Sequence, residues 1–262
     1  METEGLKARV AGAKDRHAQL AEKCRDFLSG SKPYEVYVEP MSEIGMFAVR
    51  IRVLRDPPMD WGIDVGDIAH GLRSALNQLV TELVKANGGQ PRRSNQFPIF
   101  TDQHAYRDKG HRGASPRDRQ LSGLARRDKK MIDAVQPFGR VPKSMHRDPF
   151  AQLQWLNNRD KHVELQPAFV SVSKWGISAR HPQPGKPPKL EMRLENMSPR
   201  GPMDDGELLV EAGWSGQRGV ELTADETECA VGFGERGVQV DELDRMILAV
   251  SALIDRFASR YV

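Results

Sequence analysis

The amino-acid sequence predicts an α+β protein, and two kinds of periodicity carry that prediction. Three long segments, residues 5–29, 65–86 and 240–262, repeat apolar residues with the period of an α-helix. Short segments at 34–54 and after 165 alternate apolar and polar residues between turns, which is typical of antiparallel strands. We therefore expect a helical core with a β-hairpin, a C-terminal antiparallel β-meander and a closing C-terminal helix.

The N-terminal helix and the hairpin follow one another directly. The helix over 5–29 is charged and has only a thin apolar stripe, so we expect it on the outside of a bundle or against another chain. The segments YEVYVEP and EIGMFAVRIRVL then predict two paired strands. Their alternation places Val36 and Val38 on one face, and Val49, Ile51 and Val53 on another.

The helix over 65–86 has the strongest pattern of the central region, and Asn87-Gly88-Gly89 ends it. Shorter helices are expected at 115–123 and 126–136. A further helix should begin at Pro149, because proline is favoured at the first helical position, and run to about 163. The apolar positions of the main helix are Ile68, Leu72, Ala75, Leu76, Leu79, Leu83 and Val84.

The C-terminal helix carries a broad apolar stripe that must be covered. Either the central helices or a second subunit would cover it, and the second alternative is a homodimer. Asp241 and Glu242 stand near its N-terminus, where acidic residues are favourable. The stripe consists of Leu243, Met246, Ile247, Val250, Leu253, Ile254 and Phe257.

With 262 residues the chain can form one large domain or two small ones. We predict a single α+β domain over 1–262, with a division into 1–165 and 166–262 as the alternative. No run of about 18 apolar residues is present, so the sequence predicts no membrane partner. A charged N-terminus and two distant cysteines, Cys24 and Cys229, favour the reducing cytoplasm.

The net charge of +3 conceals two oppositely charged segments. Residues 107–130 contain nine Lys/Arg against three Asp, whereas 203–244 contain twelve Asp/Glu against two Arg. Two such segments can attract each other, both can face solvent, or the basic segment can bind a polyanion. All three interpretations fit the sequence.

Polar residues lie unusually close to the apolar stripes of the helices at 65–86 and 149–163. Helical spacing puts His70, Arg73 and Asn77 on one flank of the first helix. Asn157 and Asp160 project from the core-facing side of the second. The first interpretation is a structural pin in which Arg73 pairs with Asp160, completed by Asn77 and Asn157, because buried charges are tolerated only in pairs.

The same residues support a catalytic alternative through a resemblance. The segments GDIAHGLRSALNQL, RRSNQFPIF and LQWLNNRDKH resemble those of an uncharacterised bacterial family, in which they read like LRSALDHL, RRTQFPIF and LSNIDKHR. The resemblance spans about 34–165 and implies no activity. The LRSALDHL form is also similar to the Arg-x4-His motif of HEPN ribonucleases. In those proteins the motif residues line a dimer cleft and cleave RNA without a metal ion.

The resemblance to HEPN ribonucleases implies Arg73 as the motif arginine, but Gln78 stands at the histidine position. A glutamine amide does not titrate near neutral pH, so it cannot act as a general acid or base. Another histidine would have to replace it, either His70 from the flank of Arg73 or His162 from the second helix.

The basic loops between 91 and 130 are the candidate surface for RNA or DNA. Phe97 and Tyr106 stand among these cations and are candidates for stacking on a base. The sequence contains no recognisable metal motif and no dinucleotide fingerprint, so we predict neither a metal nor a cofactor. The candidate nucleic-acid-binding residues are Arg92, Arg93, Arg112, Arg117, Arg119, Arg126 and Arg127.

These observations favour a non-enzymatic binding or interaction protein that contacts nucleic acid. A HEPN-like, metal-independent ribonuclease with a degenerate motif is the alternative, and a purely structural protein is the third.

Overall fold

The computed structural model confirms the α+β class, with a β-hairpin, antiparallel sheets and a C-terminal helix. The chain divides into two compact units. The helical unit comprises 1–20, 62–166 and 240–262, and the strand unit comprises 21–61 and 167–239. The structure describes residues 1–30, 32–139, 147–162, 168–174, 176–180, 191–193, 205–214, 218–219, 221–224 and 228–261.

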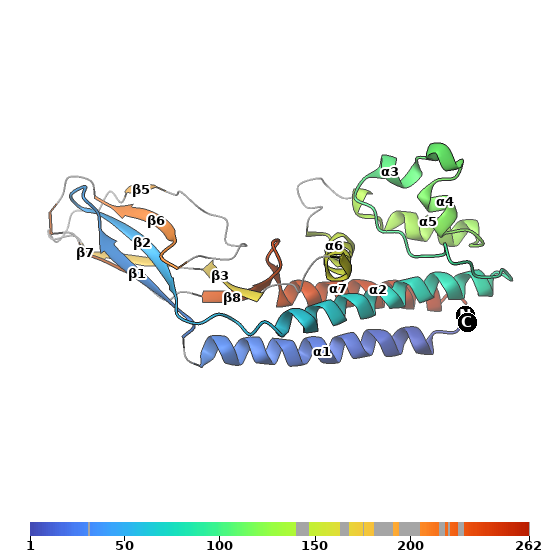
Figure 1. The fold of residues 1–262 in the computed structure, drawn as a ribbon, viewed down its shortest axis with the longest axis horizontal. Helices are drawn as coiled ribbons and strands as arrows, with labels where there is room; N and C mark the ends of the chain where they lie inside the picture. The colour runs from blue at the N-terminus through green and yellow to red at the C-terminus, as the bar shows by residue number, and fades with distance from the viewer. Residues whose placement is uncertain are drawn as a thin grey trace. The chain divides into compact units, whose positions relative to one another are not determined.

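Three long helices form the body of the helical unit. They are α1 (Glu4–Ser29, of which the part up to Leu20 belongs here), α2 (Trp61–Ala86) and α7 (Val240–Ala258), and they run side by side (Figure 1). Every apolar position predicted for the stripe of α7 is buried within this chain. The stripe is therefore covered without a second subunit, and the homodimer stays a prediction.

Short helices connect α2 to the rest of the unit, and α3, α4 and α5 lie together in Figure 1. Three of them have side-chain caps: Asp102, Ser115 and Asp148 accept hydrogen bonds from backbone N–H groups at the starts of α3, α4 and α6. The elements are α3 (Gln103–Arg107), η1 (Gly110–Arg112), α4 (Pro116–Gln120), α5 (Arg126–Ala134), η2 (Pro137–Gly139) and α6 (Pro149–His162).

The hairpin of the strand unit consists of β1 (Tyr34–Pro40) and β2 (Met46–Val53). It continues through β6 (Leu208–Gly213) to β5 (Glu191–Arg193), in the order β1-β2-β6-β5. Val36 lies opposite Ile51, and Val38 lies opposite Val49. Residues directly opposite share a face, so the expected separation of Val36 and Val38 from Val49 and Ile51 is wrong. All four pack into one cluster with Val210.

The remaining strands pair in a nested order. β3 (Ala168–Lys174) pairs with β8 (Glu228–Phe233), which also pairs with β9 (Val238–Gln239). Between them, β4 (Ile177–Arg180) pairs with β7 (Glu221–Ala224). A simple meander would pair each strand with the next, whereas here distant segments pair antiparallel. Alternation reveals a strand and its buried face but not its partner.

The two units differ from the division considered from sequence. The hairpin belongs with the later strands rather than with the helical core, and α7 belongs with the helices rather than with the strands. One domain over 1–262 stays a prediction. Among the described helices, none combines the length and the apolar character that crossing a membrane requires.

Candidate functional site

The polar flank of α2 contains a buried arginine. Arg73 is 7% exposed, and its Nη1 atom has no hydrogen-bond partner. Burial lowers the pKa of its guanidinium to about 10, because water that would solvate the charge is excluded. The sequence-based interpretation pairs Arg73 with Asp160, whose side chain lies outside the described residues. That pairing stays a prediction.

Asn77 of the predicted polar cluster contacts the backbone of the segment RRSNQFPIF. Its Oδ1 accepts a hydrogen bond from the backbone N–H of Phe97, at 3.0 Å. Gln136 acts on the same segment: its amide nitrogen donates to the carbonyl of Pro98, and its oxygen accepts from the N–H of Phe100. The motif RRSNQFPIF is thus held at its FPIF end by side chains that satisfy its backbone.

The ribonuclease alternative depends on residues that differ in exposure. His70 is exposed, and its Nε2 lies 3.5 Å from the hydroxyl of Ser74, whereas Arg73 is buried. Gln78, at the motif's histidine position, accepts a hydrogen bond from Arg9. Asn157 is buried with its Oδ1 unpartnered, and the side chain of His162 lies outside the described residues. The HEPN-like ribonuclease stays a prediction.

The basic segment, residues 91–130, is anchored by a network that the sequence did not reveal. Asp133 of α5 accepts hydrogen bonds from Nε and Nη2 of Arg117, at 2.8 and 2.6 Å. It also accepts one from the hydroxyl of the fully buried Tyr106, at 2.7 Å. Both the hydrogen bonds and the charge of Asp133 raise the pKa of Arg117 and so favour its charged form. Arg117 therefore joins α4 to α5.

A second buried carboxylate fixes the C-terminus to this segment. Asp128 is fully buried, and its Oδ2 accepts hydrogen bonds from the hydroxyl of Tyr261 and from the amide of Asn87. Arg127 lies over the Tyr261 ring, 5.2 Å from its centroid. Asp128 and Arg127 of α5 therefore link this helix to the end of α2, through Asn87, and to Tyr261 near the C-terminus.

The two aromatic residues predicted to stack on a base, Phe97 and Tyr106, belong to the hydrophobic core. Phe97 and Tyr106 are both fully buried. Phe97 stacks with Phe150 of α6, and Tyr106 packs between Phe100 and Phe138. Stacking of a base on Phe97 or Tyr106, which the sequence suggested, is wrong because neither ring reaches the surface.

The cations of the basic segment differ from its carboxylates in their partners, because each carboxylate accepts a hydrogen bond within the chain whereas most of the cations are exposed and form no ion pair. Asp102 and Asp108 accept from backbone N–H groups, and Asp118 accepts from the Ser115 hydroxyl. Among the residues that the structure describes, the following exposed cations form no ion pair with a carboxylate: Arg92, Arg93, Arg107, Lys109, Arg119, Arg126 and Lys130. The side chain of Arg112 lies outside the described residues.

Backbone contacts bring part of this set together. The buried side chain of Asn95 accepts from the N–H of Arg92 and donates to the carbonyls of Gln120 and Ser122. The turn that carries Arg92 and Arg93 is thereby fastened to the end of α4, next to Arg119. On α5, Arg126 and Lys130 share one helical face by their spacing of four residues.

Of the residues predicted for nucleic-acid binding, Arg92, Arg93, Arg119 and Arg126 are thus exposed and form no ion pair within the described chain. Arg117 and Arg127 instead have internal contacts.

No group of three His, Cys, Asp or Glu residues in the described part could hold a metal ion. No known family, curated protein or solved structure matches the chain.

Asp128, Asp133 and Gln136 are the residues that sequence reasoning missed. A usable signal existed, since Asp128 lies three and four positions before the buried Met131 and Ile132. A carboxylate among apolar positions of a helix is the same signal that singled out Arg73.

Proposed function

We propose that this protein binds nucleic acid without catalysis, through contacts between phosphate groups and the exposed arginines and lysines of the basic segment. One observation supports the proposal above the others: the carboxylates of this segment cap helices or join internal networks, while most of its cations face solvent without a carboxylate partner. Cations in that state are available to neutralise phosphates.

The proposed contacts are with the backbone of the nucleic acid. Phosphate contacts hold and orient a protein on nucleic acid but carry no sequence information. With Phe97 and Tyr106 buried, the segment offers these two rings to no base. We therefore propose binding that depends weakly on sequence and strongly on salt, because each neutralised phosphate releases condensed counterions.

The test compares wild type with Arg92→Ala/Arg93→Ala/Arg119→Ala, by fluorescence anisotropy of a labelled oligonucleotide at 50 and 200 mM salt. Affinity of the wild type should fall by about two orders of magnitude between these concentrations if about four phosphates are contacted. The triple variant should bind more weakly and should lower the salt slope by about one for each lost contact.

Arg52→Ala is the matched control, because Arg52 is an exposed arginine of the strand unit that is already paired with Glu35. It should leave binding unchanged. Salt-insensitive binding, or equal affinity of the triple variant and wild type, would refute the proposal. A triple variant that binds normally but melts at a lower temperature would assign these arginines to contacts within the chain, such as attraction to its acidic segment.

A further inference from the structure

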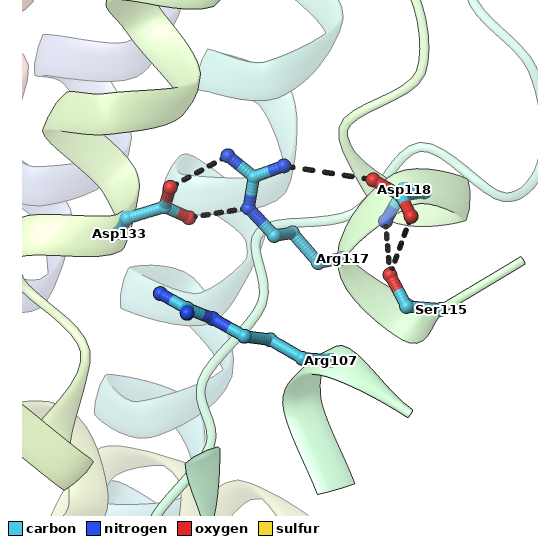
Figure 2. A pocket seen from close by; sticks show the side chains of 5 residues that line it. All are labelled: Arg107, Ser115, Arg117, Asp118 and Asp133. Carbon is cyan, nitrogen blue, oxygen red and sulfur yellow. Dashed lines mark hydrogen bonds and ion pairs between the residues drawn. The ribbon is translucent and has the colours of Figure 1, made fainter. Parts of the chain in front are cut away.

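A hollow lies at the surface of the basic segment, among α3, α4 and α5. Its volume is about 300 Å³, and it is lined by Arg107, Ser115, Arg117, Asp118 and Asp133 (Figure 2). Both arginine side chains extend along it, with the guanidinium group of Arg107 on the same side as Asp133 (Figure 2). The hollow thus presents two guanidinium groups from two different helices, together with the carboxylates of Asp118 and Asp133 on either side of Arg117.

The two arginines differ in how their charges are balanced. Arg117 is held by Asp133 at one end, and its Nη1 lies 3.5 Å from Asp118 at the other (Figure 2). Arg107 is exposed and makes no ion pair within the described chain. The Asp133 carboxylate already accepts three hydrogen bonds, from Arg117 and Tyr106, so it has little capacity left for Arg107.

Both guanidinium groups have donors to spare. A guanidinium carries five N–H donors in a planar fork, and Arg117 gives two hydrogen bonds to Asp133 while its Nη1 lies 3.5 Å from Asp118. The bidentate pairing with Asp133 fixes the plane of the Arg117 guanidinium, so the remaining N–H donors keep a defined orientation. Arg107 can approach from α3 with its whole fork free.

We propose that this hollow binds a phosphate monoester, with Arg107 as the principal contact and Arg117 as the fixed second cation. A monoester has a charge of about −1.5 to −2 at neutral pH and three acceptor oxygens, which suits the free guanidinium group of Arg107 beside the fixed one of Arg117. A phosphodiester offers one charge and two such oxygens, and so makes fewer of these contacts.

This inference rests on the proposed function, and it names a feature of the partner. In nucleic acids, phosphate monoesters occur at the ends of strands. The hollow therefore recognises a phosphorylated strand end, while Arg92, Arg93 and Arg119 contact the internal phosphates. A free mononucleotide carries the same chemical group and is the other source of ligand.

The experiment measures the affinity of three otherwise identical oligonucleotides, with a 5′-phosphate, a 3′-phosphate or hydroxyl groups at both ends. Wild type should bind one phosphorylated form about tenfold more tightly than the hydroxyl form, the effect of a charge-assisted hydrogen-bond pair. Arg107→Ala should abolish the preference, whereas Arg126→Ala should weaken all three by the same factor. Thermal melts of both variants confirm that they fold.

Equal affinity of wild type for all three oligonucleotides would overturn this inference and leave the proposed function standing. Binding of none of them would refute the proposed function, and melts with 5′-AMP and with inorganic phosphate then test the hollow alone. A melting temperature raised by 5′-AMP in wild type but not in Arg107→Ala would assign the hollow to a mononucleotide. No rise with either compound would overturn the inference.

Discussion

The arginines of the β1–β2 hairpin and the exposed arginines of the basic segment have opposite surroundings. In the strand unit, Arg52 lies directly opposite Glu35 in the neighbouring strand and donates to it at 3.1 Å, while also lying over the Tyr37 ring. Arg50 of the same strand pairs with Glu39. In the helical unit, the basic segment has exposed arginines of the same type with no such partner in the described chain.

The difference follows from geometry rather than from composition. Antiparallel register places Arg52 of β2 directly opposite Glu35 of β1, so these two side chains meet at little cost in conformational entropy. Short helices joined by turns provide no such register, and their carboxylates are used for caps and internal anchors. Arginine is therefore paired with a carboxylate in the β1–β2 hairpin, whereas several arginines of the basic segment stay available.

The largest expected effect concerns an anchor of the basic segment. Asp133→Ala removes three hydrogen bonds and leaves the guanidinium of Arg117 and the buried hydroxyl of Tyr106 without their acceptor. We expect a loss of about 3 kcal/mol in the free energy of unfolding, because one half of a partly buried ion pair is removed. Urea unfolding followed by circular dichroism measures it.

Asp118→Ala is the control for Asp133→Ala, since Asp118 is an exposed aspartate that also contacts Arg117, at 3.5 Å, and accepts a hydrogen bond from the Ser115 hydroxyl. Its removal should cost about 1 kcal/mol or less. An equal loss in both variants would show that the Asp133 network does not anchor the segment.

Periodicity was sufficient for the local elements of this fold. The helices at 5–29 and 65–86 and the hairpin over 34–54 match α1, α2 and the β1–β2 pair within a few residues. These patterns are local, since a helix or strand that buries one face repeats apolar residues at its own period. The apolar stripe of α7 was also predicted from its helical period, and every one of its positions is buried in the structure.

Long-range partners could not be predicted from the same patterns. The nested pairing of β3 with β8 joins segments about 60 residues apart, and nothing in either segment's alternation specifies the other. In the candidate site, the exposure of Arg92 and Arg93 could be predicted, because both lie in a polar loop. The role of Arg117 depends on Asp133 and Tyr106, which lie 16 and 11 positions away, so the sequence grouped it with the free cations.

The strand unit should become less stable in alkali. Burial raises the pKa of the Cys229 thiol from 9.0 to about 12, and burial together with Cys229 raises the pKa of Tyr34 from 10.0 to about 12. Above about pH 9 the unfolded chain releases these protons while the folded chain keeps them. Stability is therefore full below pH 9 and falls as the pH rises toward 12.

Urea midpoints measured from pH 8 to 11 test this for wild type and Cys229→Ala. The wild-type midpoint should fall with pH, and the variant should fall less steeply between pH 9 and 10, where the thiol of the unfolded chain ionises more than the Tyr34 hydroxyl. Identical slopes would mean that the Cys229 thiol titrates in the folded protein as it does in the unfolded chain.

A smaller effect is expected from the buried arginine of α2. Because the pKa of Arg73 is lowered to about 10, its buried charge costs stability at neutral pH, and this cost is relieved only as the pH rises above 10. Arg73→Met keeps the volume and removes the charge, so the melting temperature should stay the same or rise slightly. Thermal melting measures this directly.

The same variant tests both sequence-based interpretations of Arg73. A loss of about 3–5 kcal/mol would reveal a buried carboxylate partner, as the predicted pairing with Asp160 requires. Incubation with a mixed RNA pool tests the HEPN-like alternative. We expect no cleavage by wild type, whereas cleavage that disappears in a stably folded Arg73→Met protein would make the arginine catalytic.

The smallest expected effect is that of breaking the cross-strand pair between Glu35 and Arg52. Glu35 and Arg52 are each about half exposed, so water and salt screen their attraction, and Glu35→Gln should cost less than about 1 kcal/mol. The variant has a second use, since it frees an arginine on the strand unit. If free exposed arginines alone were enough for nucleic-acid binding, Glu35→Gln would increase the affinity. We expect no increase, because in the helical unit several such cations are held near one another by the contacts of Asn95, and a single arginine contributes only one phosphate contact.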